Sequence, residues 1–382
     1  MSNSNMIKDV VTLADKLIRL KTISRHYHEI KKCARFLDIY AQRNNLYYEY
    51  HDNGNNPVLI FSNGEKRNFD IISLGHIDVV PGSDEIFTPT LTNEVLTGRG
   101  SFDMKTGVAV GLELLSWVKR ENKDINMGVV LTSDEEIQEA KSMDFVQDLG
   151  IKSDVILDID ALSGISTIVE KNKDVVFVNL ISEGQRASGM LPWEGKSAID
   201  QLLATIQKIR EHFPYFEMDK KPDEQPFGRH YWVDSLNIGT INGGSQINRV
   251  SDIATAQLDF RLVNGMDGKK LSEILNHCLV GKTRYEIRYE TGFVNEDRHN
   301  PVIEEYKQIV EDTISQKVDF IRDGRMSNSG MLKDKKGASV ILHSYTGGGY
   351  HAEDEWVDLK SVKQLCSIQT TFVNRYIAKK ER

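Results

Sequence analysis

Two histidines and a set of carboxylates stand directly after apolar runs or glycine turns, where they could bind metal ions and transfer protons. His76 and Asp78 follow the apolar run Ile71–Leu74, and Asp103 follows the turn Gly98–Gly100. The other members follow two further apolar runs and a stretch of glycines: Asp134, Glu135, Glu136, Asp158, Asp160 and His351. Each cluster alone could be an ordinary polar rim. Because ligands collect at the carboxyl ends of strands in open α/β sheets, their recurrence favours one shared site.

These residue types together indicate a site for divalent metal ions. Carboxylates that lie close together repel one another, and their pKa values rise unless cations neutralise the charge. Imidazole and carboxylate ligands suit zinc, cobalt or manganese better than magnesium or calcium. Two histidines and three carboxylates exceed the ligands typical of one catalytic zinc, so we expect two ions with a bridging carboxylate. A further carboxylate that is not a ligand would take the proton from the attacking water.

The elements that must hold these residues alternate between strands and helices. Apolar residues at helical spacing predict helices over Ile7–Leu20, Glu29–Asn44 and Gly107–Val118. Short apolar runs bounded by polar residues predict strands at Pro57–Phe61, Phe69–Leu74, Met127–Leu131 and Val155–Ile159. This rhythm indicates an α/β domain with a largely parallel sheet.

The middle of the chain has a different order of elements. We expect strand, helix, strand, strand, helix and strand at Val175–Ile181, Ser197–Phe213, Ser235–Ile241, Ala254–Leu262, Lys269–Leu279 and Tyr285–Tyr289. This order is typical of a ferredoxin-like α+β domain. The helix-then-strand rhythm returns after Pro301 and ends in a helix near Leu359–Ala378. We therefore predict one domain formed by residues 1–173 and 291–382, with residues 174–290 inserted as a second domain.

The composition excludes several classes of protein. The 382 residues include 48 Lys and Arg against 56 Asp and Glu, a net charge of −8, which argues against nucleic-acid binding. No apolar run approaches the roughly 20 residues of a membrane span, so we expect no membrane partner. Three widely spaced cysteines and a polar start without a signal peptide favour a cytoplasmic protein.

The clusters resemble, in the same order, the metal-binding motifs of a known enzyme family. Gly75–Pro81 resembles the first motif, Gly98–Lys105 the second, Asp134–Glu136 the third and the HxxxE pattern His351–Glu355 the last. The sequence is similar to the co-catalytic di-zinc amidohydrolases and peptidases that include acetylornithine deacetylase, succinyl-diaminopimelate desuccinylase, aminoacylase and carboxypeptidase G. The resemblance implies a zinc-peptidase (phosphorylase/hydrolase-like) three-layer α/β domain, an inserted lid and dimerisation domain, and a homodimer.

The resemblance also implies the metal ligands. His76 and Asp160 would bind one ion, Glu136 and His351 would bind the other, and Asp103 would bridge the two. Strand alternation puts Asp160 at the carboxyl tip of its strand, which favours it as the ligand. Asp158 lies on the same face and remains an alternative.

Further residues are implied to act around the ions. Glu135 would be the general base, and Asp78 would hold the second ring nitrogen of His76. Arg261 and Asn248 lie in segments that resemble the family's segment for binding the substrate carboxylate. Arg261 is a good candidate for that contact, because guanidinium makes two-point contacts with carboxylates. Arg261 could equally form an ordinary strand-end salt bridge. Asn328 occupies the place of another loop that approaches substrate.

One position departs from the family pattern. The family has the order Gly-x-x-x-His-x-x-x-Pro in its inserted domain, and here Ser188 replaces that histidine between Gly184 and Pro192. In the family this residue reaches across the homodimer to stabilise the tetrahedral oxyanion, a contact whose loss can cost on the order of 10²–10³ in rate. Arg186 or His230 could supply another donor. Alternatively, the substrate requires less stabilisation of its oxyanion, or the protein has lost its hydrolytic activity.

The sequence therefore predicts a metal-dependent hydrolase with two divalent ions, zinc first and cobalt or manganese next. It would cleave an amide or peptide bond in an N-acyl amino acid or small peptide that carries a free carboxylate, and the motifs leave deacylase and peptidase both open. The alternative is a catalytically impaired homologue that binds metal and ligand, motivated by Ser188.

Overall fold

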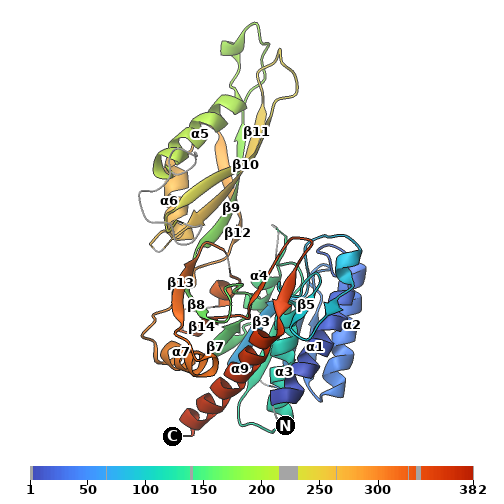
Figure 1. Cartoon of the computed structure of the whole chain (residues 1–382). Coiled ribbons are helices and arrows are strands. Elements are labelled where there is room, and N and C mark those ends of the chain that lie inside the picture. Colours follow the sequence, from blue (N-terminus) through green and yellow to red (C-terminus); the bar gives the residue numbers. More distant parts are fainter. Residues whose placement is uncertain are drawn as a thin grey trace. The chain divides into compact units, whose positions relative to one another are not determined.

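The computed structural model describes residues 3–65, 67–137, 141–214, 231–263, 265–325, 327–332 and 337–381. The chain forms two compact units (Figure 1). The first unit comprises Met1–Glu170, Glu296–Ile321 and Ser327–Arg382, and the second comprises Lys171–Asn295 and Arg322–Met326. Both ends of the chain thus belong to the first unit.

The first unit is built around an eight-stranded sheet with the order β1-β2-β6-β3-β7-β14-β8-β13. In chain order these strands are β1 (Tyr47–His51), β2 (Val58–Ser62), β3 (Asn68–His76), β6 (Met127–Thr132), β7 (Lys152–Asp158), β8 (Thr167–Asn172), β13 (Asp319–Asp323) and β14 (Ser339–Leu342). β3 is parallel to both β6 and β7, and β14 is parallel to β7. β1, β2 and β6 pair in antiparallel fashion. The α/β class is confirmed, but the sheet is parallel only at its centre.

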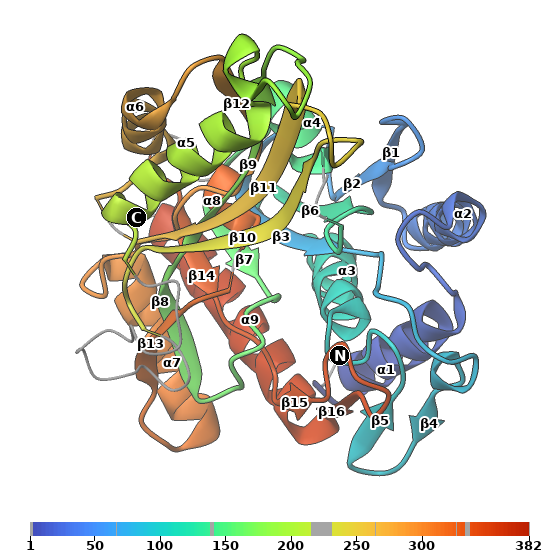
Figure 2. The same cartoon turned by 90° about the horizontal axis from the view of Figure 1, so that it is seen from above.

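Helices cover this sheet and form the larger hydrophobic core. They are α1 (Asn3–Arg19), α2 (Tyr27–Arg43), α3 (Lys105–Arg120), α4 (Ser142–Asp148), α7 (Pro301–Ile314), α8 (Ser329–Leu332) and α9 (Leu359–Lys380). α3 packs against α1 and against β3 and β6 (Figure 2). A Cβ at Gly111 would lie 2.6 Å from Ser73 Oγ, so glycine permits the close approach of α3 to β3.

The first unit also contains a 3₁₀ turn and a second, smaller sheet. A 3₁₀ turn spans Glu85–Phe87. A second sheet of the first unit has the order β15-β16-β5-β4, formed by Gly347–Gly348, Trp356–Asp358, Val95–Thr97 and Thr90–Leu91. This small sheet was not predicted, because strands of two or three residues leave no periodic pattern. It joins the segment before Asp103 to the segment that carries His351.

The second unit has the expected ferredoxin-like order of elements. Its sheet has the order β10-β11-β9-β12, with β9 (Asp174–Glu183), β10 (Ser235–Gly243), β11 (Ile253–Leu262) and β12 (Thr283–Glu290). Two helices, α5 (Ala198–His212) and α6 (Gly268–Cys278), lie together on one face of it (Figure 1), and a 3₁₀ turn spans Pro192–Glu194. Burial alternates along β11 because only one face of the strand meets the helices.

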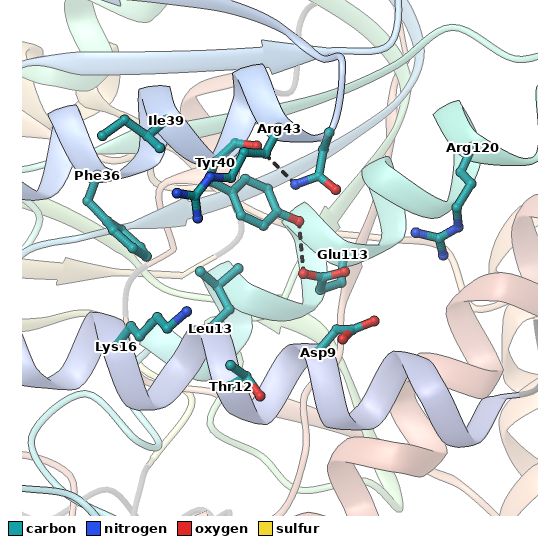
Figure 3. Close-up of a pocket in the computed structure, with 11 residues that line it drawn as sticks. Asp9, Thr12, Leu13, Lys16, Phe36, Ile39, Tyr40, Arg43, Glu113 and Arg120 are labelled. Carbon is teal, nitrogen blue, oxygen red and sulfur yellow. Dashed lines mark hydrogen bonds between the residues drawn. The ribbon is translucent and has the colours of Figure 1, made fainter.

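A surface pocket of about 260 Å³ lies between α1, α2 and α3 of the first unit (Figure 3). Glu113 lies among its lining side chains and accepts a hydrogen bond from the Tyr40 hydroxyl at 2.9 Å. Among the residues described, no helix combines the length and the apolar composition that a membrane span requires.

Candidate metal centre and active site

The parallel centre of the large sheet brings three of the predicted clusters together. In register, Leu74 of β3 lies beside Val130 of β6 on one side and Asp158 of β7 on the other. The three strands therefore end at the same edge of the sheet. His76 is the last residue of β3, while Glu135 and Asp160 come shortly after β6 and β7.

His76 is the buried centre of one half of the cluster. Its side chain is 2% exposed, and its Nε2 lies 3.2 Å from Asp103 Oδ1 and 4.0 Å from both Glu135 Oε2 and Asp160 Oδ2. Ligands about 2.0–2.2 Å from a zinc ion stand roughly 3.3–3.6 Å apart in a tetrahedral arrangement. The spacing around His76 is close to that of ligands sharing one ion.

His351 forms the other half with Glu136. Its Nε2 lies 3.1 Å from Glu136 Oε2 and 3.4 Å from Asp103 Oδ2. The backbone of His351 is left-handed, with φ of 62°, which is uncommon for a residue other than glycine. The tight connection from β15 to β16 therefore turns this side chain toward the cluster at some backbone cost.

Asp103 stands between the two histidines. Its Oδ1 faces His76 and its Oδ2 faces His351, as a carboxylate that bridges two ions would do. Asp103 is 7% exposed and lies two residues before α3, and its peptide bond to Met104 is cis. The geometry agrees with the bridging role that the resemblance implies, and that role stays a prediction.

The contacts of Asp78 differ in part from the expectation. His76 Nδ1 lies 3.0 Å from the backbone carbonyl of Asp78 and 3.5 Å from its carboxylate, so the shorter contact is to the main chain. The carboxylate of Asp78 instead accepts the backbone N–H groups of Glu135 and Glu136, each at 3.1 Å, and the hydroxyl of Ser24 at 2.8 Å. Asp78 therefore fixes the turn that carries the predicted base.

Asp160 rather than Asp158 faces the cluster. The carboxylate of Asp158 is already bound by Ser327 Oγ at 2.7 Å and by the backbone N–H of Asp160 at 3.0 Å. Oδ1 of Asp160 is buried and has no hydrogen-bond partner among the described residues. A buried carboxylate oxygen without a donor is costly, and a metal ion at the cluster would satisfy it.

The carboxylates of the cluster have strongly perturbed pKa values. Burial raises the pKa of Glu135 to about 8, with Glu136 and Asp103 adding to the rise and His76 opposing it. Burial also raises the pKa of Asp160 far above its usual range, and Asp103 adds to this rise. Burial acts to raise the pKa of Asp103 too, but hydrogen bonds with His351 and His76 lower it.

Hydrogen bonds with Asp103 and Glu136 raise the pKa of His351 to about 10. This cluster would therefore hold extra protons unless cations replaced them. The residues present fit a pair of divalent ions, because two imidazoles and a surplus of buried carboxylates surround the carboxylate of Asp103.

The remaining predicted residues have contacts within their own units. Asn328 is 9% exposed and belongs to the turn before α8 in the first unit. In the second unit, Arg261 forms a two-point ion pair with Asp259, at 2.8 and 3.0 Å, which is the strand-end salt bridge left open by the sequence. Asn248 is exposed, and its carbonyl accepts the N–H of Gly189. The substrate roles of these residues stay predictions.

The position that departs from the family pattern also lies in the second unit. Ser188 forms an isolated bridge with Arg249, and its hydroxyl accepts the N–H of Met190 at 3.2 Å. The guanidinium of Arg186 is paired with Asp252 at 2.6 Å. His230, the other predicted donor, lies outside the described residues.

The sequence interpretation missed one feature of the site. Glu355, with no assigned role in the HxxxE pattern, is 1% exposed and accepts N–H groups from the loop that carries Asp103. Its position four residues after His351 was the available signal. A sequence pattern alone does not show which hydrogen-bond donors lie close to a carboxylate in the folded chain.

Comparison with known proteins identifies structures that share this fold. Among solved structures, an M20 family metallo-carboxypeptidase from Sulfolobus solfataricus has a TM-score of 0.72 at 15% identity, covering 97% of this chain and 99% of that one. A tripeptidase from Staphylococcus aureus has a TM-score of 0.71 at 17% identity, covering 97% and 99%. At these identities the likeness shows the fold, which is that of two-domain peptidases.

Sequence relatives extend the comparison. A probable succinyl-diaminopimelate desuccinylase of Staphylococcus epidermidis is 24% identical over 335 residues, covering 79% of this chain and 80% of that protein. A probable carboxypeptidase of Aspergillus niger is 25% identical over 238 residues, so this chain spans 55% of its length. Residues 72–375 match peptidase family M20/M25/M40, and the chain belongs to that family, which is metal-dependent. The predicted relationship is confirmed.

Proposed function

We propose that this chain is a hydrolase that uses two divalent metal ions, most readily zinc, to cleave an amide or peptide bond next to a free carboxylate. The observation that carries this proposal is the arrangement of Asp103 between His76 and His351, with Glu135 Oε2 4.0 Å from His76 Nε2. Metallo-carboxypeptidases, tripeptidases and desuccinylases among the relatives and structural neighbours support the same reaction class.

His76, Asp103 and Asp160 would hold one ion, while Asp103, Glu136 and His351 would hold the other. The ions would supply polarisation of the substrate carbonyl and a water of lowered pKa. Glu135 would take a proton from the attacking water at Oε2 and return it to the leaving nitrogen. Asp78 keeps Glu135 in place through the backbone N–H contacts of the turn.

The two possible substrate classes, N-acyl amino acids and small peptides, share a free carboxylate. Deacylation and peptide cleavage differ only on the acyl side of the bond, while both leave an amino acid or peptide with a carboxylate. We propose that Arg261 and Asn248 bind that carboxylate, and that Asn328 belongs to another loop that approaches the substrate. A substrate whose carboxylate is converted to an amide should therefore be cleaved more slowly.

The homodimer is proposed to form through the second unit. β10 is an edge strand, and several large apolar side chains of this unit are exposed: Ile241, Ile247, Met190 and Trp193. Unpaired strand edges and exposed apolar groups favour association. The three cysteines are free thiols, which suits the reducing cytosol proposed as its compartment.

The test is release of free amine from a panel of N-acyl amino acids and small peptides, with zinc-reconstituted protein and a chelator-treated control. Glu135→Gln should lower turnover by about 10²–10⁴ while the protein still binds zinc. Glu304→Gln, an exposed carboxylate on α7 that lies 3.3 Å from His299, is the control and should keep wild-type turnover. Equal turnover in wild type and Glu135→Gln would refute the assigned base. Zinc-loaded wild type that cleaves nothing in the panel would favour the catalytically impaired alternative, which the comparisons do not support.

A further inference from the structure

A buried ion pair joins two segments that lie far apart in the sequence. Arg99 Nη1 lies 2.8 Å from Glu355 Oε2, and both side chains are at most 1% exposed. In other ion pairs of the first unit, such as Arg298–Glu170 and Lys380–Asp70, the basic side chain is at least half exposed to solvent. Taking both charges out of water is expensive, and such pairs add little net stability compared with apolar residues of the same size. Net stability therefore does not explain this ion pair, and we consider which parts of the chain it holds in place.

The carboxylate of Glu355 holds the loop that leads to Asp103. It accepts the backbone N–H groups of Gly100, Phe102 and Asp103 at 2.9–3.0 Å, in addition to Arg99. Three main-chain donors and one guanidinium saturate its two oxygens. Glu355 is therefore neither a free base nor a free ligand, and its contacts act on the backbone of Asp103 directly.

Arg99 extends the same connection to the segment after β3. Its Nη2 donates to the carbonyl of Pro81 at 3.2 Å. Pro81 follows His76 and Asp78 in the first motif, and Glu355 follows His351 by four residues. The pair thus ties together the three segments that carry His76, Asp103 and His351.

We propose that the Arg99–Glu355 pair is a positioning element that sets Asp103 relative to His76 and His351, and thereby sets the affinity of the cluster for divalent metal. This inference rests on the proposed function, because it takes Asp103 and the two histidines as ligands. Residues that orient metal ligands from outside the coordination sphere typically change metal affinity or activity by 10- to 100-fold when replaced.

Glu355→Gln tests the proposal with zinc alone as the probe. The amide keeps one oxygen for the loop N–H groups, but its NH₂ group faces the guanidinium, so the tie to Arg99 is lost. We expect zinc affinity, measured by competition with a chromophoric chelator below the unfolding temperature, to fall by roughly 10- to 100-fold. Circular dichroism on the same samples shows whether the variant is folded.

A second buried carboxylate supplies the matched control. Glu170 is 5% exposed and makes a two-point ion pair with Arg298 at 2.8–3.1 Å in the same unit. Glu170→Gln should lower the melting temperature but leave zinc affinity within about twofold of the wild type. This control separates loss of stability from loss of positioning.

Each outcome decides a different claim. Folded Glu355→Gln with wild-type zinc affinity would overturn the positioning role and leave the proposed function intact. A wild-type chain that binds no zinc would overturn the proposed function, and this inference with it. If Glu355→Gln does not fold, Arg99→Lys takes its place. Lysine keeps the charge but cannot contact Glu355 and Pro81 together, so undiminished zinc affinity in this variant would overturn the proposal.

Discussion

Replacing Glu113 with glutamine should stabilise the first unit at neutral and higher pH. Glu113 is 7% exposed, lies on α3 and faces the pocket between α1, α2 and α3 (Figure 3). Burial raises its pKa from 4.5 to about 7, Asp9 adds to the rise, and the hydrogen bond from Tyr40 opposes it. The folded chain therefore holds this proton over a range of pH in which the unfolded chain has lost it.

The sign and size of the effect follow from this difference in pKa. Where the folded state binds more protons than the unfolded state, the free energy of unfolding falls as pH rises. Stability from this carboxyl is complete below about pH 4.5, declines up to the folded pKa of about 7, and is then constant. A rise from 4.5 to about 7 corresponds to about 3 kcal/mol at 1.36 kcal/mol per unit.

Glutamine keeps an acceptor for the Tyr40 hydroxyl but has no ionisable group. The free energy of unfolding of the variant should therefore not show this decline with rising pH. The melting temperature of Glu113→Gln minus that of the wild type should therefore grow from pH 5 to pH 8, by roughly 6–10 °C. Asp9→Asn in the wild-type background should shift the midpoint of the wild-type decline to lower pH. Parallel melting curves for wild type and Glu113→Gln across this range would refute the reasoning.

Three further predictions concern the metal cluster, the oxyanion and the dimer. Asp103→Ala should reduce bound zinc from two ions per chain to one or fewer, because both histidines lose their shared carboxylate, and elemental analysis that still finds two ions would contradict the bridge. Ser188→His should raise turnover by tenfold or more if a missing oxyanion donor limits the rate, and unchanged kinetics would mean that another donor already acts there. Ile241→Lys on the edge strand β10 should shift the protein from dimer to monomer in analytical ultracentrifugation, since a charge would face the proposed interface. A wild-type chain that sediments as a monomer would contradict that interface.

The fold was predictable where residues repeat at a regular period. The apolar runs that became β3 and β6 are buried on both faces, so they read as strands even though they do not alternate. The order of elements in the second unit was also visible, because amphipathic helices alternate with strands there. β1 alternates only weakly in burial, and the strands β4 and β15 have two residues each, too few to show a period, so none of the three gave such a signal.

The members of the candidate site were predictable, but their contacts were not. Sequence motifs singled out the residues that gather at the strand ends, and they preferred Asp160 to Asp158 from strand alternation. They did not predict that the carbonyl of Asp78 would lie nearer to His76 than its carboxylate does. They also gave no role to Glu355, whose donors are backbone groups more than two hundred residues away in sequence.

The sequence by itself determined the kinds of chemistry available, because residue type and motif order define which groups can bind metal and move protons. Only the tertiary structure decided which carboxylates remain open to an ion. Asp158 and Glu355 are saturated by hydroxyl, guanidinium and backbone donors, whereas Asp160 keeps a buried oxygen without a partner among the described residues. The physical reason is that hydrogen-bond donors come from whatever segments pack nearby, and packing depends on the whole chain rather than on a local pattern.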